Sequence, residues 1–222
     1  MTATGSVKAY KGMGMEGWIA KWYASTTLKR VPEFQRVAVR VAAELPSQSR
    51  ILEVAPGPGY LAIELAKAGN FEITGLDISE TFVGIARENA ARERVRIDFR
   101  RGNAAAMPFE NDTFDRVICT AAFKNFFQPV KALEEMRRVL RPSGKAIVMD
   151  LRKDTPLSAI DTYINCSGVN LFSRIFMKWT FRGMLLKRAY TIEQFGVMAR
   201  QAGFTRIRIE EIELGFEATL EK

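Results

Sequence analysis

The feature that most constrains this chain is an apolar run that passes directly into a glycine-rich turn, in the stretch 51–62 (ILEVAPGPGYLA). The run is typical of a buried strand at about 50–55, although it contains an acid, Glu53. Gly57 and Gly59 permit a tight turn and leave room for a ligand to approach the backbone. A helical pattern follows from Tyr60 to Ala68. The succession of strand, turn and helix predicts a cofactor-binding unit.

A second predicted strand, Ile73 to Asp77, ends on a carboxylate eighteen residues after Gly59. In nucleotide-binding folds an acid at this distance binds the ribose. The stretch 57–62 also fits the G-x-G-x-x-A pattern, so these two features suit NAD as well as other adenosine-type cofactors. They predict an adenosine-type cofactor and leave an NAD-dependent dehydrogenase as an alternative.

Strand and helix patterns alternate along the rest of the chain. Strands are predicted at 95–99, 114–119 and 145–150, and helices at 79–92, 129–141 and 191–202. Ser79 is expected to cap the first of these helices, and Pro142-Ser143-Gly144 to end the second. The runs 206–213 and 216–221 predict an antiparallel pair. We therefore expect an α/β fold: a doubly wound, mostly parallel, seven-stranded Rossmann-like sheet with a C-terminal antiparallel hairpin and a helical cap.

Length and composition favour a single domain. With 222 residues, 47% of them hydrophobic, the chain can bury one sizeable core. The expected parts are an N-terminal cap segment (1–32), a cofactor-binding core (33–150), a cap insertion (151–190) and a last helix with the closing hairpin (191–222). A membrane-spanning run and a secretory leader are missing from the sequence, which predicts a cytoplasmic protein.

Histidine is absent and the two cysteines lie far apart, at Cys119 and Cys166. A metal centre or a disulfide framework has little to build on, so no metal is expected and both thiols are predicted to be buried and inert. The usual imidazole base is also excluded.

The net charge of +8 is concentrated in two segments. Residues 1–30 contain five Lys or Arg against one acid, and residues 151–190 contain seven against two, which leaves the remainder near neutral. All three tryptophans lie in the same two segments. A near-neutral core with a basic, aromatic covering is therefore predicted.

Four blocks of the sequence, in this order, resemble class I S-adenosylmethionine-dependent methyltransferases of the small-molecule and quinone-biosynthesis group. They are Leu52–Gly59, Gly75–Ser79, the region 102–115 with Gly102-Asn103-Ala104, Met107-Pro108-Phe109 and Phe114-Asp115, and Leu133–Gly144. The resemblance covers residues 33–150 firmly and 191–221 loosely. Glu53, the Gly-Asn-Ala block and the predicted hairpin favour this family over a dehydrogenase.

The resemblance implies S-adenosylmethionine as the cofactor and S-adenosylhomocysteine as the product. Asp77 would bind the ribose hydroxyls, Asn103 the adenine amino group, and Glu53 would order the turn and a water or ammonium group beside the cofactor. Against these roles stand a structural anchor for Glu53 and a helix cap for Asp77. Ala55 replaces the family's first glycine, and its methyl group is tolerable only with ordinary dihedrals. The implied cofactor-binding residues are Tyr23, Glu53, Ala55, Gly57, Gly59, Asp77, Ile78, Asn103, Ala104 and Thr120.

Methyl transfer places modest demands on catalytic groups, because holding the acceptor in line supplies much of the acceleration. The sequence therefore identifies no catalytic residue. Lys124, Asn125 and Asp150 are candidates near the carboxyl edge of the sheet, and Asn125 resembles part of the Arg-Asn region of quinone C-methyltransferases. A helix cap or a surface loop is the alternative for these residues.

The segment 171–186 predicts an amphipathic helix with a basic stripe at Arg174, Lys178 and Arg182. Its apolar side could cover a substrate as a lid, the helix could contact anionic lipid, or the stripe could simply be solvated. The lid is preferred because the segment follows the fifth strand, where the family inserts substrate-covering elements.

The predicted function is metal-free methyl transfer from S-adenosylmethionine to a small apolar or aromatic, possibly acidic molecule by in-line displacement. Alternatives are a quinone-type C-methyltransferase and a non-catalytic cofactor-binding partner protein. RNA methylation is disfavoured because Thr120-Ala121-Ala122-Phe123 stands where nucleobase methyltransferases have an Asn-Pro-Pro-Tyr motif, so nucleic acid is not an expected partner. Peripheral contact with an anionic membrane stays open, and neither the acceptor atom nor the oligomeric state is predicted.

Overall fold

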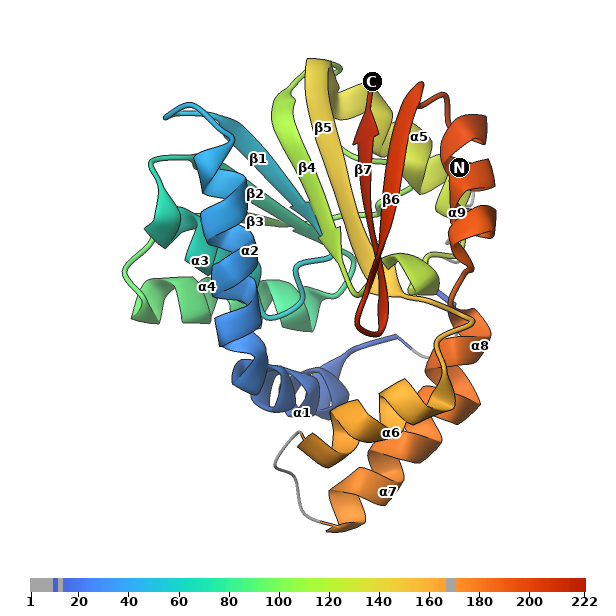
Figure 1. Cartoon of the computed structure of the whole chain (residues 1–222). Coiled ribbons are helices and arrows are strands. Elements are labelled where there is room, and N and C mark those ends of the chain that lie inside the picture. Colours follow the sequence, from blue (N-terminus) through green and yellow to red (C-terminus); the bar gives the residue numbers. More distant parts are fainter. Residues whose placement is uncertain (1–9, 12–13, 167–170) are drawn as a thin grey trace, which may run out of the picture.

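A seven-stranded sheet forms the centre of the computed structural model, which describes residues 10–11, 14–166 and 171–222 (Figure 1). The strand order is β3-β2-β1-β4-β5-β7-β6. Neighbours among the first five are parallel, whereas β7 is antiparallel to both β5 and β6. The strands are β1 (Arg50–Val54), β2 (Glu72–Asp77), β3 (Asp98–Arg101), β4 (Phe114–Thr120), β5 (Leu140–Leu151), β6 (Arg206–Ile212) and β7 (Gly215–Glu221). The expected fold class, hairpin included, is confirmed.

Helices cover both faces of the sheet because side chains alternate along its strands (Figure 1). Ile51 and Ile118 point into a core shared with α2 (Val31–Ala43), α3 (Tyr60–Ala68) and α4 (Glu80–Arg92). Leu52 and Val117 point the opposite way, into a core shared with α5 (Pro129–Val139) and α9 (Ile192–Gln201). These two cores fix the order of the strands and place their carboxyl ends along one edge.

The remaining helices gather beyond that carboxyl edge (Figure 1). From the N-terminal side come α1 (Gly17–Thr27) and the short turn η1 (Leu28–Arg30). After β5 come α6 (Leu157–Cys166), α7 (Leu171–Thr180), the π-helical turn η3 (Phe181–Leu185) and α8 (Leu186–Arg188). A further short turn, η2 (Phe123–Asn125), follows β4. Both sequence-predicted cap segments thus lie at the edge of the sheet where ligands bind in α/β folds.

Element boundaries agree with the sequence prediction where caps are explicit. Ser79 caps α4 by accepting a hydrogen bond from the amide of Phe82, 3.1 Å from its Oγ. The prediction for the helix at 129–141 was wrong at its end: α5 stops at Val139, because Leu140 already pairs with Phe114 in the sheet. The third strand begins at Asp98, so the alternating residues from Val95 precede it.

The predicted helix 171–186 is interrupted. It begins as α7, but the π-helical turn η3 shifts the register from Phe181 onward, so one straight face does not run through it. Cys119 is buried, as predicted, whereas the thiol of Cys166 lies outside the described residues. None of the described helices is both long and apolar enough to cross a membrane.

Candidate cofactor and acceptor site

The turn after β1 carries two glycines and one alanine in the left-handed region of backbone space. The φ angles are +56° at Ala55, +55° at Gly57 and +79° at Gly59. Ordinary dihedrals at Ala55 were the condition for tolerating its methyl group, and this condition is not met: the alanine is held in a region that costs a non-glycine residue about 1 kcal/mol or more. The amide of Ala55 donates to the Leu76 carbonyl at 2.8 Å, which ties the strained turn to β2.

The two glycines have different reasons to be there. A Cβ at Gly57 would meet no atom within 4 Å, so this position faces open space, as close approach of a ligand requires. A Cβ at Gly59 would lie 2.8 Å from the Phe99 ring and 3.0 Å from the Ala86 methyl group. The missing side chain of Gly59 is therefore required by packing against β3 and α4, and its place beside the cofactor stays a prediction.

Asp77 stands at the carboxyl end of β2 with both carboxylate oxygens engaged. Oδ2 accepts from the Gly57 amide at 3.0 Å, and Oδ1 accepts from the Ser79 amide at 2.9 Å. Burial raises the pKa of Asp77 to about 6, although the two amides act in the opposite direction. The residue therefore organises the turn and the start of α4. Since each carboxylate oxygen has a second lone pair, it can also accept from a ribose hydroxyl.

Glu53 is fully buried inside β1, and its Oε2 has no hydrogen-bond partner among the described residues. Burial raises its pKa to about 8, the Ala62 amide acts against this rise, and the charge of Asp77 adds to it. Ala62 lies in the first turn of α3, so Glu53 also satisfies a free amide of that helix. An orphaned acidic oxygen beside a glycine turn fits a cofactor that carries an ammonium group and hydroxyls.

The N-terminal segment docks on the α4 side of this turn. Glu16 accepts from the amides of Glu80 and Thr81, each at 3.1 Å, which satisfies free amides of the first helical turn. Tyr23 of α1 packs edge-on against Phe82 of α4, with ring centroids 5.8 Å apart. The structure thus gives Tyr23 a packing contact in the N-terminal cap.

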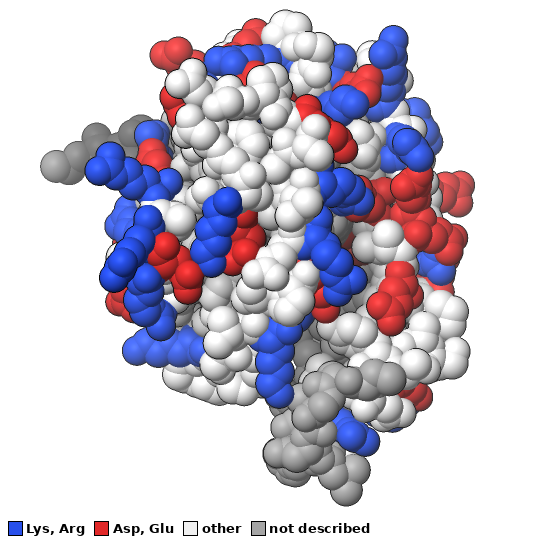
Figure 2. All heavy atoms as spheres, turned by 60° about the vertical axis from the view of Figure 1, so that its left-hand side comes forward, with Lys and Arg blue, Asp and Glu red and all other residues white. Residues whose placement is uncertain are grey.

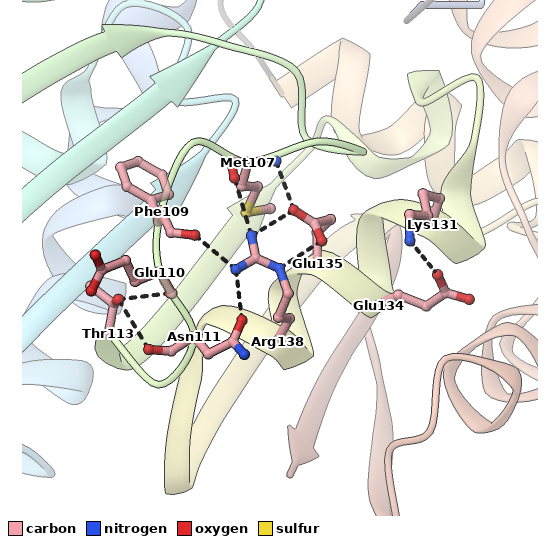
Figure 3. A network of polar contacts seen from close by, with 9 residues as sticks. All are labelled: Met107, Phe109, Glu110, Asn111, Thr113, Lys131, Glu134, Glu135 and Arg138. Atoms are coloured by element: carbon pink, nitrogen blue, oxygen red, sulfur yellow. Dashed lines mark hydrogen bonds and ion pairs between the residues drawn. The ribbon is translucent and has the colours of Figure 1, made fainter.

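The loop after β3 presents Asn103 and is held from the opposite side by α5. Asn103 Oδ1 accepts from the Ala105 amide at 2.9 Å, so one of its lone pairs serves a local turn. Arg138 donates to the carbonyls of Met107 at 3.1 Å and Phe109 at 2.7 Å, while Glu135 accepts from the Met107 amide at 2.8 Å (Figure 3). The fourth sequence block therefore fixes the loop formed by the third block.

Two further predicted cofactor residues lie nearby, Ala104 in this loop and Thr120 at the end of β4. Ala104 packs partly buried against the core, and Thr120 is the half-buried last residue of β4. Ile78 follows Asp77 and exposes 38% of its surface, where an apolar side chain could cover a flat ring. All ten predicted cofactor residues lie at or near the carboxyl edge. Two of them, Gly59 and Tyr23, also have packing contacts there.

Lys124 and Asp150 form a buried ion pair behind the ends of β4 and β5. The Lys124 Nζ lies 2.7 Å from Asp150 Oδ1 and 2.5 Å from the Ala121 carbonyl oxygen, and the Lys124 amide donates to Asp150 Oδ2 at 2.7 Å. Both side chains are almost fully buried. Burial makes the alternative of a surface loop wrong for this pair, whereas the Asp150 carboxylate does accept from an amide of the short helix η2, as a helix cap would, and so anchors η2 to β5.

Two residues of the basic stripe, Lys178 and Arg182, form ion pairs with α6. Arg182 forms a bidentate pair with Asp161 at 2.9 and 2.8 Å, and Lys178 lies 3.4 Å from the same carboxylate. Ile175 and Trp179 are 62% and 68% exposed. These two side chains are thus largely exposed, and the lid stays a prediction.

Sequence reasoning did not single out Tyr10 and Arg188, which the structure brings to this edge. Tyr10 forms an antiparallel bridge with Phe126, just beyond η2, and its phenol is close enough to Arg188, Asp77 and Asp150 for each to shift its pKa. No local signal reveals this, because Tyr10 lies 116 residues before Phe126 and belongs to no motif. The basic and aromatic composition of the two outer segments was the available hint.

A surface depression also lies away from the candidate site. It measures about 670 Å³ and opens among Arg50, Glu72 and Asp98, at the amino ends of the strands and therefore opposite the carboxyl edge. On the face seen in Figure 2, Lys and Arg side chains are interspersed with Asp and Glu. A continuous basic surface for nucleic acid is not visible on this face.

Comparison with known sequences finds a methyltransferase domain and relatives named demethylmenaquinone methyltransferases. A family model described as a methyltransferase domain matches residues 51–144. A demethylmenaquinone methyltransferase of Deinococcus radiodurans is 36% identical over 116 residues, which is 52% of this chain and 48% of that protein. Another, from Lactiplantibacillus plantarum, is 28% identical over 184 residues, covering 78% of each chain. The matched region thus spans about half the length of the first relative and more of the second.

The fold has a solved counterpart over nearly its whole length. The crystal structure of a candidate S-adenosyl-L-methionine-dependent methyltransferase from Methanococcus maripaludis superimposes with a TM-score of 0.77 at 20% identity, covering 98% of this chain and 97% of that one. At this identity the likeness concerns the fold. Residues 51–144, which include the glycine turn between two acids, thus match a methyltransferase domain, and the chain has the fold of a class I S-adenosylmethionine-dependent methyltransferase.

Proposed function

We propose that this protein transfers the methyl group of S-adenosylmethionine to a ring carbon of a hydroquinone-type acceptor. The observation that carries the proposal is the orphaned Glu53 Oε2 beside the Gly57 turn and Asp77, in a chain whose relatives are named demethylmenaquinone methyltransferases. A reduced ring suits the acceptor role because its hydroxyl oxygens donate electron density to the adjacent carbon, whereas an oxidised quinone ring is electron-poor.

The proposed cofactor position follows the carboxyl edge from β1 to β3. Glu53 faces the ammonium end, the open space at Gly57 receives the chain of the methionine part, and Asp77 accepts from the ribose. Asn103 keeps a lone pair for the adenine amino group. Ile78, Ala104, Ala55 and Thr120 border this path, and Tyr23 bounds it on the α1 side.

The chain itself contributes to the reaction by positioning the acceptor and by excluding water from the site. When bound, the cofactor supplies an activated methyl group on a positive sulfur. The residues at the ends of β4 and β5 then have to hold the acceptor ring in line with that group. Lys124 and Asp150 neutralise each other in the buried pair, so this pair is proposed to support the site rather than to move a proton.

We also propose that the cap end of the molecule contacts an anionic membrane surface, where a lipid-soluble acceptor would be met. Trp18 of α1 and Trp179 of α7 are 76% and 68% exposed, and the two helices lie at the same end of the molecule (Figure 1). Exposed tryptophans favour the membrane interface, and basic residues favour anionic lipid. Cosedimentation with phosphatidylglycerol vesicles but not phosphatidylcholine vesicles is expected. Equal recovery with both, or a Trp18→Ser, Trp179→Ser double variant that sediments like the wild type, would count against this contact.

The function is tested in two stages. Calorimetric titration is expected to show binding of S-adenosylmethionine and S-adenosylhomocysteine, and no binding of NAD. A short-chain demethylmenaquinone, kept reduced, is then incubated with labelled cofactor, and the product is expected to gain one methyl group on carbon. If the cofactor binds and the quinol gains no label, but a member of a panel of phenols, thiols and amines is methylated, the acceptor belongs to that other class of molecule. Cofactor binding without any turnover would favour the non-catalytic partner protein.

A further inference from the structure

The N-terminal end of the described chain crosses the carboxyl edge of the sheet beside β4. Tyr10 bridges Phe126, and the Lys11 amide donates to the Asn125 carbonyl at 2.8 Å. The Lys11 ammonium also donates to the Tyr190 hydroxyl and lies 4.5 Å from the centre of its ring. These contacts pin Tyr10 between the sheet and the segment that leads out of the cap.

The Tyr10 phenol lies among the groups that border the proposed reaction centre. Burial raises its pKa to about 12; Arg188 acts against the rise, and Tyr23, Asp77 and Asp150 add to it. Asp77 ends β2 and Asp150 lies near the end of β5, so both carboxylates that act on the phenol come from the carboxyl edge, where the backbone bridge to Phe126 also places Tyr10. At neutral pH it is protonated and available as a hydrogen-bond donor.

Arg188 is the cation of this group, and its guanidinium makes few polar contacts with the described residues. In the described part of the chain its polar contact is one long hydrogen bond, 3.5 Å from Nη1 to Asn125 Oδ1. Arg182, on the same cap, has both oxygens of Asp161. A half-buried guanidinium without a carboxylate partner, beside a phenol that donates, suits an anionic oxygen.

We propose that Tyr10 and Arg188 together bind the ionised ring oxygen of the acceptor, next to the carbon that receives the methyl group. The inference rests on the proposed function and narrows its substrate class to aromatic rings that present a hydroxyl beside a free ring position. Arg188 lowers the pKa of the bound hydroxyl by its charge, and Tyr10 stabilises the resulting oxyanion by hydrogen bonding.

The step balances without a protein base of high basicity. The acceptor hydroxyl loses its proton to solvent on binding, and the oxyanion pushes electron density onto the neighbouring carbon. That carbon forms the new C–C bond while the C–S electron pair stays on sulfur. The ring then loses the proton of the methylated carbon, its oxygen is reprotonated, and one proton in total is released.

The first experiment uses 1-naphthol, whose ionisation changes its absorbance, as a probe that needs no turnover. It is titrated with pH on the whole protein, with and without S-adenosylhomocysteine. Bound naphthol is expected to ionise at least one pH unit below free naphthol. Arg188→Gln should remove the shift, Tyr10→Phe should reduce it, and Arg182→Gln, the matched cap control, should retain it. Absence of saturable binding, or an identical ionisation in Arg188→Gln and wild type, would overturn the assignment.

The second experiment separates this inference from the proposed function. The KM for reduced demethylmenaquinone is expected to rise at least tenfold in Tyr10→Phe and Arg188→Gln, while the Kd for S-adenosylmethionine stays within twofold of wild type. A rise in the cofactor Kd of the same size as the rise in KM would assign the two residues a structural role. If wild-type protein methylates the quinol but the naphthol ionisation is unshifted, the inference fails and the function stands. If the cofactor does not bind, the function fails, and the naphthol titration without S-adenosylhomocysteine still decides the inference.

Discussion

The Asp77 carboxylate accepts a hydrogen bond from the Gly57 amide, with 3.0 Å between Oδ2 and the nitrogen. The end of β2 is thereby joined to the turn after β1, and its second oxygen is joined to the Ser79 amide at 2.9 Å. The same side chain organises the backbone and is proposed to bind the ribose. Asp77→Ala would therefore disturb the turn as well as a ribose contact, because truncation also releases the Gly57 and Ser79 amides.

Wild-type protein therefore provides the cleaner test of Asp77. Since the pKa of Asp77 is raised to about 6, the carboxylate is ionised above that pH and protonated below it. The affinity for adenosine, which has a ribose but no ammonium group, should be constant near pH 8 and fall roughly tenfold as the pH drops well below 6, as a charged acceptor becomes neutral. Calorimetry between pH 5 and 8 measures this. A flat affinity profile over that range would contradict the ribose assignment.

Because of Glu53, the free energy of unfolding should fall as the pH rises toward the alkaline range. Its pKa is raised from 4.5 to about 8 in the folded protein. Protonated Glu53 therefore contributes fully to the free energy of unfolding below pH 4.5, the pKa of the unfolded chain, and this contribution is lost as the pH rises through about 8, the pKa of the folded protein. Glu53→Gln, a neutral isostere, should match wild type near pH 5 and exceed its free energy of unfolding near pH 9. Urea unfolding at both pH values checks this, with exposed Glu88→Gln as the control. A Glu53→Gln protein that is less stable at pH 9 would show that the ionised form is preferred.

Cofactor binding should also release protons from Glu53. The ammonium group of S-adenosylmethionine placed beside Oε2 would favour the ionised acid, whereas adenosine lacks that group. Near pH 7, the calorimetric enthalpy of S-adenosylmethionine binding should vary with the ionisation enthalpy of the buffer, and the variation should shrink in Glu53→Gln. The same buffer dependence in both proteins would assign the proton to another group.

Ala55→Gly should stabilise the protein. Ala55 has a φ of +56°, where glycine is unstrained, and relief of this strain outweighs the extra entropy of glycine in the unfolded chain. We expect a gain of about 0.5–1 kcal/mol in the free energy of unfolding by urea titration. Ala91→Gly, on an exposed turn of helix α4, should instead lose about as much. A loss at both positions would indicate that the Ala55 methyl group makes compensating contacts.

The two ion pairs of α5 in Figure 3 should differ in importance. Arg138 joins Glu135 to the carbonyls of the loop after β3, so Arg138→Ala should cost about 1.5–3 kcal/mol and weaken adenosine binding. Lys131 and Glu134 are 53% and 43% exposed, so Lys131→Ala should cost less than about 0.5 kcal/mol. Chemical unfolding and adenosine calorimetry measure both. Similar costs for the two variants would show that the loop does not depend on Arg138.

The buried pair of Lys124 and Asp150 should respond strongly to the loss of one partner. Lys124→Met leaves a buried carboxylate beside no cation and should lower the free energy of unfolding by about 3–5 kcal/mol. Adding Asp150→Asn should recover much of this loss, because the remaining group is then neutral. Unfolding curves of the single and double variants form the test. A double variant no more stable than Lys124→Met would mean that the ion pair itself is required.

Periodicity determined the elements of the core. The helix at Tyr60–Ala68 was predicted at its observed bounds, and the Ser79 cap was recognised because a serine oxygen preceding a helical pattern has a specific local partner. The end of α5 was misjudged because Leu140 fits the helical face of its neighbours, while pairing with Phe114 from a distant part of the chain draws it into the sheet. Local pattern carries no record of such competition.

The glycine turn and its two acids were likewise accessible from the sequence, because strand, turn and helix are local and their spacing fixes where the side chains fall. The burial that raises the pKa values of Glu53 and Asp77, the left-handed conformation of Ala55 and the packing reason for Gly59 were decided by the tertiary structure. So was the meeting of Tyr10 with Arg188, since residues 178 positions apart approach only when the cap and the N-terminal segment close over the same edge. Short-range patterning thus determined the part of the edge where the cofactor is proposed to bind, and long-range packing decided the part where the acceptor is proposed to bind.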